Sequence, residues 1–216
     1  MFYLFEKGLK IDFNADINII VGENGSGKST LFSLIHQYAG KKEDNPFILA
    51  SFEETEEQSI MRHREKYQGE LQIDSDVPLS YKNTVFFSAE KDNPVVAIPN
   101  MLNPENRNFA SMVNQLFDAN EESHGESLLP ILKFILSNAY DMHIFMDEPD
   151  TALSLKNQIW LVKAIQKSCK ENHNQIFIST HALALINQFN LLYDMEERLW
   201  RDKDNYINEM LNAKIK

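Results

Sequence analysis

The segment GENGSGKST, residues 22–30, constrains the fold of this chain more than any other stretch. Three of the chain's seven glycines lie within it. Glycine reaches backbone torsions and close contacts that a Cβ would block, so successive N–H groups here can turn inward around an anion. The apolar run 17–21 before the segment predicts a strand, and the run 31–35 after it predicts a helix. The bound anion would then lie at a helix N-terminus, which favours negative charge.

The side chains of this segment, called the phosphate loop below, complete the prediction of a nucleotide site. Lys28 is expected to place its charge on the β- and γ-phosphates, and Ser29 to bind Mg²⁺. A flexible Gly/Ser turn is the alternative, but the pattern G-x-x-x-x-G-K-[ST] between a strand and a helix is rare by chance. The residues expected to contact the nucleotide are Gly22, Asn24, Gly25, Ser26, Gly27, Lys28, Ser29 and Thr30.

The composition excludes several classes of protein. The chain has 216 residues, 43% of them hydrophobic, which is enough for one large domain with a substantial core. The formal net charge of −11 argues against unaided binding of nucleic acid, although local basic patches stay open. One cysteine, Cys169, excludes an internal disulfide and fits a reducing compartment. With no signal-peptide pattern and no long apolar stretch, a soluble cytoplasmic protein without membrane segments is expected.

The pattern of apolar runs predicts an α/β fold with a largely parallel sheet. A strand over 143–146, an amphipathic helix over 155–171 and a strand over 176–178 form a strand–helix–strand unit, which implies parallel pairing. Further strands are expected at 84–87 and, as an N-terminal antiparallel hairpin, at 2–5 and 9–13.

The whole chain, 1–216, is interpreted as one domain. Its parts are a core lobe at about 1–40 and 140–190, an insertion at about 41–83, a helical lobe at about 90–139 and a mostly charged helical tail at 191–216. Two helices are expected in the helical lobe, at about 109–119 and 125–139, and Pro130 is expected to make the start of the second irregular.

Two further motifs follow strands of the predicted sheet. Asp147 and Glu148 end an apolar strand, where a parallel sheet presents its ligand groups. Asp147 is expected to bind Mg²⁺, and Glu148 to orient the water that attacks the γ-phosphate. His181 follows the neighbouring strand and could reach the same phosphate. Considered without the other motifs, Asp147 and Glu148 could be an exposed strand end, and His181 could be a surface histidine.

The motifs together resemble those of an ABC-type ATPase, a P-loop NTPase fold. The ordered set is GENGSGKST, SHGES at 123–127, IFMDEPD at 144–150, TALS at 151–154 and STH at 179–181. The resemblance implies a homodimer that sandwiches two ATP molecules with Mg²⁺. The segment SHGES, residues 123–127, corresponds to the signature motif of this family. The resemblance also implies that Ser123, Gly125 and Glu126 of this motif cap the nucleotide held by the other subunit.

Particular versions of the motifs are similar to those of small stand-alone ATPases related to the RecF, SMC and OLD-type proteins. These versions are SHGES, TALS and FFSAE at 86–90. Where the family carries a metal- and water-contacting glutamine, Glu90 is the best positional candidate. The segment before the signature motif shows no heptads for a coiled coil. The resemblance implies links to DNA maintenance or phage defence.

The expected function is therefore ATP hydrolysis coupled to opening and closing of a dimer, which drives or gates a partner protein or a nucleic-acid complex. The alternative is an ATP-dependent assembly switch that controls an effector, such as a nuclease or toxin, with slow or incidental hydrolysis. A transporter subunit is less favoured, since the transporter-like version of the signature motif is missing. A small-molecule kinase is also less favoured, because such an enzyme needs neither a signature motif nor a histidine like His181 that contacts the γ-phosphate.

Overall fold

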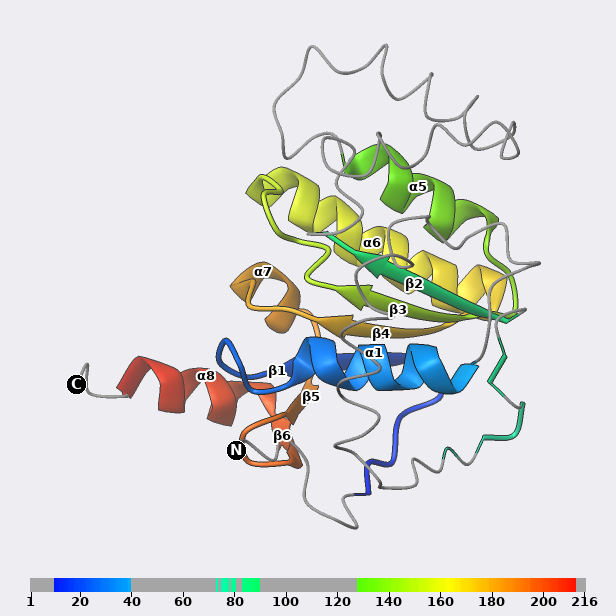
Figure 1. The fold of residues 1–216 in the computed structure, drawn as a ribbon. Helices are drawn as coiled ribbons and strands as arrows, with labels where there is room; N and C mark the ends of the chain where they lie inside the picture. The colour runs from blue at the N-terminus through cyan, green and yellow to red at the C-terminus, as the bar shows by residue number, and fades with distance from the viewer. Residues whose placement is uncertain are drawn as a thin grey trace.

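The structure of the protein is a computed structural model that describes residues 10–39, 73, 75–77, 79–80, 83–89 and 128–212. Helices and strands follow one another within these ranges in an α/β order (Figure 1). The strands are β1 (Ile17–Val21), β2 (Thr84–Ser88), β3 (His143–Asp147), β4 (Gln175–Ser179), β5 (Leu191–Asp194) and β6 (Leu199–Asp202). The helices are α1 (Lys28–Ala39), α5 (Leu129–Asn138), α6 (Leu155–Asn172), α7 (Leu183–Ile186) and α8 (Lys203–Asn212).

The six strands form one mixed sheet in the order β2-β3-β4-β1-β5-β6. All neighbouring pairs are parallel except β5 and β6, which are antiparallel. The predicted strand–helix–strand unit is confirmed, because α6 connects the parallel neighbours β3 and β4. As a result, the three strands that precede the sequence motifs, β3, β4 and β1, lie side by side.

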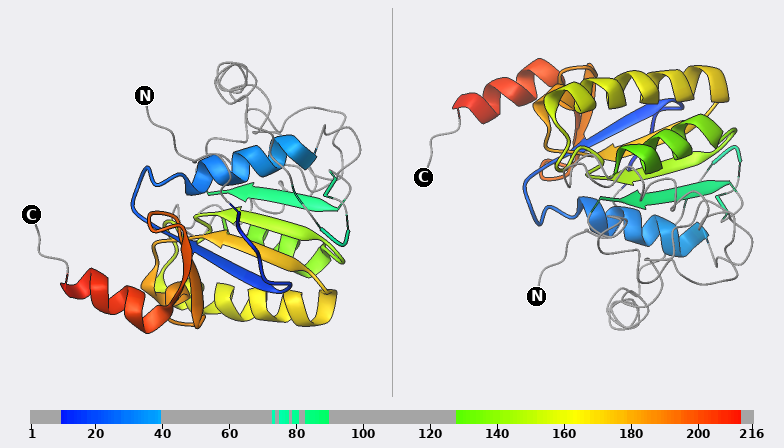
Figure 2. Two further views of the ribbon diagram at one scale, coloured as in Figure 1. Left: turned by 90° about the horizontal axis from the view of Figure 1, so that it is seen from below. Right: turned by 90° about the horizontal axis from the view of Figure 1, so that it is seen from above.

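Helices cover both faces of the sheet. In Figures 1 and 2, α1 lies on one face, and α5 and α6 lie on the other. The strand residues alternate accordingly: Ile144 and Met146 belong to the core shared with α5 and α6, whereas Phe145 belongs to the core shared with α1. These three side chains are each at most 1% exposed. Full burial of such a side chain contributes about 1.5–3 kcal/mol, so β3 is held from both faces.

A row of aromatic rings supports the face under α1. Phe86, Phe145 and Phe177 are aligned across β2, β3 and β4 by the strand register. Their rings stack with centroid separations of 4.9 and 4.3 Å. Phe32 of α1 meets Phe145 edge-on at 5.5 Å. This row fixes α1, and with it the phosphate loop that leads into α1, relative to β3.

The strand expected at 9–13 is not formed over its described residues, 10–13. The carbonyl of Asp12 accepts a hydrogen bond from Trp200 Nε1 at 3.0 Å, so this backbone group is satisfied by a side chain. Phe13 packs edge-on against Phe177 at 5.1 Å and contributes its ring to the core without joining a strand ladder. The partner strand expected at 2–5 lies outside the described residues.

The expectation of a helical tail over 191–216 is wrong for its first half. Within its described residues, 191–212, this segment forms β5 and β6, and only α8 is helical. Leu192 and Tyr193 are buried because β5 adds to the edge of β1. The antiparallel pair of the described sheet therefore lies here, in the C-terminal part of the chain.

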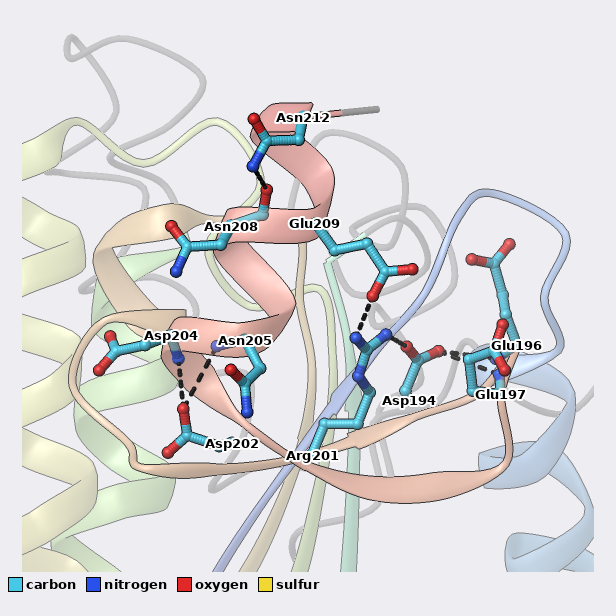
Figure 3. Close-up of polar contacts among 10 residues, drawn as sticks. All are labelled: Asp194, Glu196, Glu197, Arg201, Asp202, Asp204, Asn205, Asn208, Glu209 and Asn212. Carbon is cyan, nitrogen blue, oxygen red and sulfur yellow. Dashed lines mark hydrogen bonds and ion pairs between the residues drawn. The ribbon is translucent and has the colours of Figure 1, made fainter. Parts of the chain in front are cut away.

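An ionic link anchors α8 to this strand pair (Figure 3). Arg201 of β6 lies between Asp194 of β5, at 3.1 Å, and Glu209 of α8. The guanidinium also lies over the ring of Tyr206, with its Cζ 5.8 Å from the centroid. Asp194 is 2% exposed, and its second oxygen accepts the N–H of Glu196 at 2.9 Å, so the buried charge is paired and hydrogen-bonded.

The helical lobe is described only in part. The second predicted helix is confirmed as α5, which begins at Leu129 and has Pro130 in its first turn, where a proline removes no helical hydrogen bond. The predicted helix at 109–119 and most of the insertion at 41–83 lie outside the described residues. In α6, Val162 and Ile165 are buried as expected, but Ile159 is 46% exposed and faces away from the core.

Candidate nucleotide-binding site

The phosphate loop adopts the conformation that its glycines predict. Gly22, Gly25 and Gly27 all have positive φ angles, of 142°, 86° and 102°. A Cβ at Gly22 would lie 2.7 Å from Ser26 Oγ, so a larger residue would collide inside the loop. A Cβ at Gly25 would have no heavy atom within 4 Å. The loop is therefore tightly folded on the side of Gly22 and open at Gly25.

Polar groups of the loop fit a phosphate. Ser26 Oγ is buried and has no hydrogen-bond partner among the described residues. The loop leads directly into α1, whose first residues include Lys28, Ser29 and Thr30, so free N–H groups of a helix N-terminus lie beside it. Asn24 and Ser29 are exposed, and Thr30 is half-buried.

Lys28 folds back over the loop. Its Nζ donates to the carbonyl oxygens of Gly22 at 2.9 Å and Glu23 at 3.1 Å, and the residue is 4% exposed. Burial lowers the pKa of Lys28, and the carboxylates of Glu148, Asp147 and Glu196 partly oppose this effect. The ammonium group thus lies close to three negative charges, two of which are the predicted catalytic and metal-binding carboxylates.

Asp147 ends β3, and the neighbouring strand holds its side chain in place. Ser179 Oγ, at the end of β4, donates to Asp147 Oδ1 at 2.5 Å. The strand register also pairs Asp147 with Ser179 on one side and with Ser88 on the other. The second carboxylate oxygen, Oδ2, and the Ser29 hydroxyl are oxygen ligands of the kind that Mg²⁺ prefers.

Glu148 stands at a sharp turn directly after β3. Its φ of 50° is left-handed, a conformation uncommon for a residue other than glycine. Its N–H donates to the carbonyl oxygen of Ser179 at 3.1 Å and to Ser179 Oγ at 3.0 Å. These bonds offset part of the energetic cost of the left-handed backbone at Glu148.

The structure brings Glu148 and His181 together as a pair. His181 Nε2 lies 3.5 Å from Glu148 Oε1, and the two side chains are 42% and 39% exposed. The contact arises because β4, which precedes His181, lies between β3 and β1 in the sheet. The predicted general base and the predicted phosphate-contacting histidine therefore share one edge of the sheet with the phosphate loop.

Two acidic residues near this edge were missed by sequence reasoning. Asp150 is 7% exposed and accepts a hydrogen bond from Thr180 Oγ1 at 2.6 Å. Glu196 lies in the β5–β6 turn (Figure 3), close enough to Lys28 to affect the pKa of the lysine. Met195 N of the same turn donates to the carbonyl oxygen of Val21, the last residue of β1, at 2.9 Å, so the turn is joined to the strand that leads into the phosphate loop. The acidic run of the sequence around Asp150 could have flagged that residue, but no local pattern marks Glu196.

The remaining predicted site residues lie outside the described part of the chain. These are Glu90, the candidate for the glutamine position, and Ser123, Gly125 and Glu126 of the signature motif. Within the described residues, no group of three or more His, Cys, Asp or Glu side chains could hold a metal ion by itself. Mg²⁺ would instead share its ligands with the nucleotide phosphates, as it commonly does.

The comparison with protein families decides the family. The model of a family described as an AAA domain matches residues 2–214, almost the whole chain. The chain belongs to this AAA domain family. Together with the relatives described next, the match confirms the predicted resemblance to ABC-type ATPases.

Among the described residues, no helix is long and apolar enough to cross a membrane.

Two curated relatives are ATP-binding proteins by name. A protein of Methanosarcina acetivorans named as an ABC transporter ATP-binding protein is 28% identical over 202 residues, covering 86% of this chain and 70% of its own length. The lacticin-481/lactococcin-DR transport/processing ATP-binding protein of Lactococcus lactis is 27% identical over 218 residues and covers 97% of this chain. This chain spans only 29% of the Lactococcus protein.

Among solved structures, the SMC head domain from Thermotoga maritima is similar to this chain. It has 19% sequence identity and a TM-score of 0.48, and the match covers 85% of this chain and 87% of that one.

Proposed function

We propose that this protein is an ATPase that binds ATP with Mg²⁺ at the phosphate loop and hydrolyses it. The observation that carries the proposal is the convergence of Lys28, Asp147, Glu148 and His181 at one edge of the sheet. A phosphate-binding lysine, a metal-binding carboxylate and a base within 3.5 Å of a histidine are the groups that phosphoryl transfer to water requires.

Each side chain has a distinct part in this reaction. Lys28 would exchange its two carbonyl partners for phosphate oxygens, and its charge would stabilise the developing negative charge. Bound Mg²⁺, held by Ser29 and Asp147, would supply charge neutralisation and orient the phosphates. Glu148 would orient and polarise the attacking water, and His181 would contact the γ-phosphate while holding Glu148.

The proposed working form is a homodimer around two ATP molecules. Glu148 and His181 are 39% and 42% exposed at an open edge, so a second subunit could complete the site. Ser123, Gly125 and Glu126 would then cap the nucleotide of the other subunit, and Glu90 would join the water and metal. The motion would pass to a partner protein or a nucleic-acid complex, in DNA maintenance or phage defence.

Two substitutions test the enzymatic part of the proposal. Glu148→Gln removes the base but keeps the shape of the side chain, so the turnover of Mg·ATP should fall about 100-fold or more while ATP binding is retained. Lys28→Ala should weaken binding itself. Glu171→Gln, in the last turn of α6 and ion-paired with Lys167, is a matched control and should hydrolyse ATP at the wild-type rate. Equal rates for all four proteins would refute the proposal.

A second candidate is the ATP-dependent assembly switch. The same Glu148→Gln protein separates the two, since a switch would still assemble and signal to its effector without hydrolysis, whereas a motor would stall.

A transporter ATP-binding subunit is a third candidate, favoured by the names of both curated relatives. It predicts that the protein sediments with membranes of the source cells and is released by detergent. A protein that remains in the supernatant would exclude this candidate.

A further inference from the structure

A buried hydrogen bond joins the two loops that carry Glu148 and His181. Asp150 lies two residues after Glu148, and Thr180 lies directly before His181. Thr180 Oγ1 donates to Asp150 Oδ1 at 2.6 Å, and the two residues are 0% and 7% exposed. A buried carboxylate is costly unless it is hydrogen-bonded, and a bond to a charged acceptor is stronger than a neutral one. Neither residue has a part in the chemistry proposed above.

The Thr180 hydroxyl both donates and accepts a hydrogen bond. Its oxygen accepts the backbone N–H of Ala182 at 3.0 Å, on the far side of His181. A hydroxyl has a single proton to donate, and here it is committed to Asp150. The backbone that carries His181 is therefore fixed between Thr180 and Ala182, and Asp150 fixes that unit in turn. Burial raises the pKa of Asp150, which reflects how little water reaches the carboxylate.

The opposite loop is equally constrained around Asp150. Its carbonyl oxygen accepts the N–H of Leu153 at 3.0 Å, and the carbonyl oxygen of Glu148 accepts the N–H of Thr151 at 3.0 Å. Glu148 and Ala152 have left-handed φ angles of 50° and 63°. Such conformations persist only where the surroundings fix them. Asp150 is the described residue of this turn whose side chain is both buried and bonded to the His181 loop.

We propose that Asp150 and Thr180 are positioning residues that set the separation of Glu148 and His181. The inference rests on the proposed ATPase function. Because Thr151–Ser154 follow Asp150 directly, the same bond couples that segment to the histidine loop. A rearrangement of residues 151–154 would then shift the backbone at His181 through the Asp150–Thr180 hydrogen bond. It would not require the solvent-exposed contact between Glu148 and His181.

Thr180→Val tests the proposal, because it removes the hydroxyl with little change in volume. Misplacing a catalytic group by about 1 Å can cost about 100-fold in rate, so kcat should fall about 10- to 100-fold while KM for Mg·ATP stays within about twofold. Thr180→Ser keeps the hydroxyl and should restore kcat to within about threefold of wild type. Asp150→Asn, which keeps the Oδ1 acceptor, serves as a second variant if Thr180→Val does not fold.

Amide hydrogen exchange gives a readout that does not depend on hydrolysis. In Thr180→Val, exchange should become faster in peptides covering 148–154 as well as in those covering 180–182, and Thr180→Ser should match wild type in both. A wild-type kcat in Thr180→Val, or faster exchange confined to 180–182, would overturn the proposal. If wild type hydrolyses ATP no faster than Lys28→Ala, the proposed function fails, and the exchange data alone decide whether the bond couples the loops.

Discussion

At the residue scale, the candidate site is a small set of charged side chains that hydrogen bonds hold in place. Lys28 is bonded to two carbonyl oxygens, Asp147 to Ser179, and Asp150 to Thr180. Each bond fixes a charged group that would be costly to bury alone. Glu148 and His181, whose side chains are partly exposed to solvent, contact each other instead. A nucleotide that enters from solvent would need both features: charged groups fixed by hydrogen bonds, and side chains that solvent can reach.

The buried carboxylate of Asp150 predicts a pH-dependent stability. Burial raises the pKa of Asp150 above its ordinary value of about 3.9, so the folded state holds this proton more tightly than the unfolded state. Its favourable contribution is complete below about pH 4 and is lost as the pH rises through the raised pKa. Within that window the free energy of unfolding should fall by up to about 1.4 kcal/mol per pH unit relative to an uncharged residue.

Asp150→Asn isolates this effect, because all other titrating groups are shared with wild type. Denaturant unfolding of both proteins between pH 4 and pH 8 should show that the variant gains stability relative to wild type as the pH rises. A difference in unfolding free energy that is constant with pH would mean that Asp150 ionises as freely in the folded state as in the unfolded chain.

At the element scale, the strands that carry motifs were predicted from sequence and the strands that do not were missed. The runs 17–21, 143–146 and 176–178 are apolar and bounded by polar residues, so their burial on both faces could be predicted. The segment 191–202 mixes Leu191, Leu192 and Tyr193 with charged residues, and its β structure depends on pairing with β1, about 170 positions earlier in the chain. Local sequence cannot encode such a partner, so the approach of Glu196 to Lys28 was also missed.

The C-terminal end of α6 provides a test of helix capping. His173 ends the helix in a left-handed conformation, with φ 56° and ψ 32°, and its side chain is exposed. A residue with a Cβ pays about 1 kcal/mol for this conformation, whereas glycine does not. His173→Gly should therefore raise the free energy of unfolding by about 1 kcal/mol in a denaturant titration. His173→Ala, which keeps the Cβ, should leave it nearly unchanged. A destabilised glycine variant would show that the histidine side chain itself supports the helix end.

At the scale of the whole molecule, the topology explains why motifs far apart in sequence meet. β1, β3 and β4 are adjacent and parallel, so the loops that follow them open at the same edge of the sheet. Figure 2 shows α8 extending from the molecule at this end, and Arg201 ties it to the strand next to β1. The order of the motifs predicts which residues form the candidate site, but the Asp150–Thr180 bond depends on side-chain packing that the motifs do not specify.

The most direct test of the account is the mass of the Glu148→Gln protein in solution, with and without Mg·ATP, measured by light scattering. The proposed ATP sandwich predicts a change from one chain of 25.0 kDa to two on adding Mg·ATP, and Lys28→Ala in the same background should abolish it. A mass that does not respond to Mg·ATP, in a protein shown to bind the nucleotide, would contradict assembly around ATP.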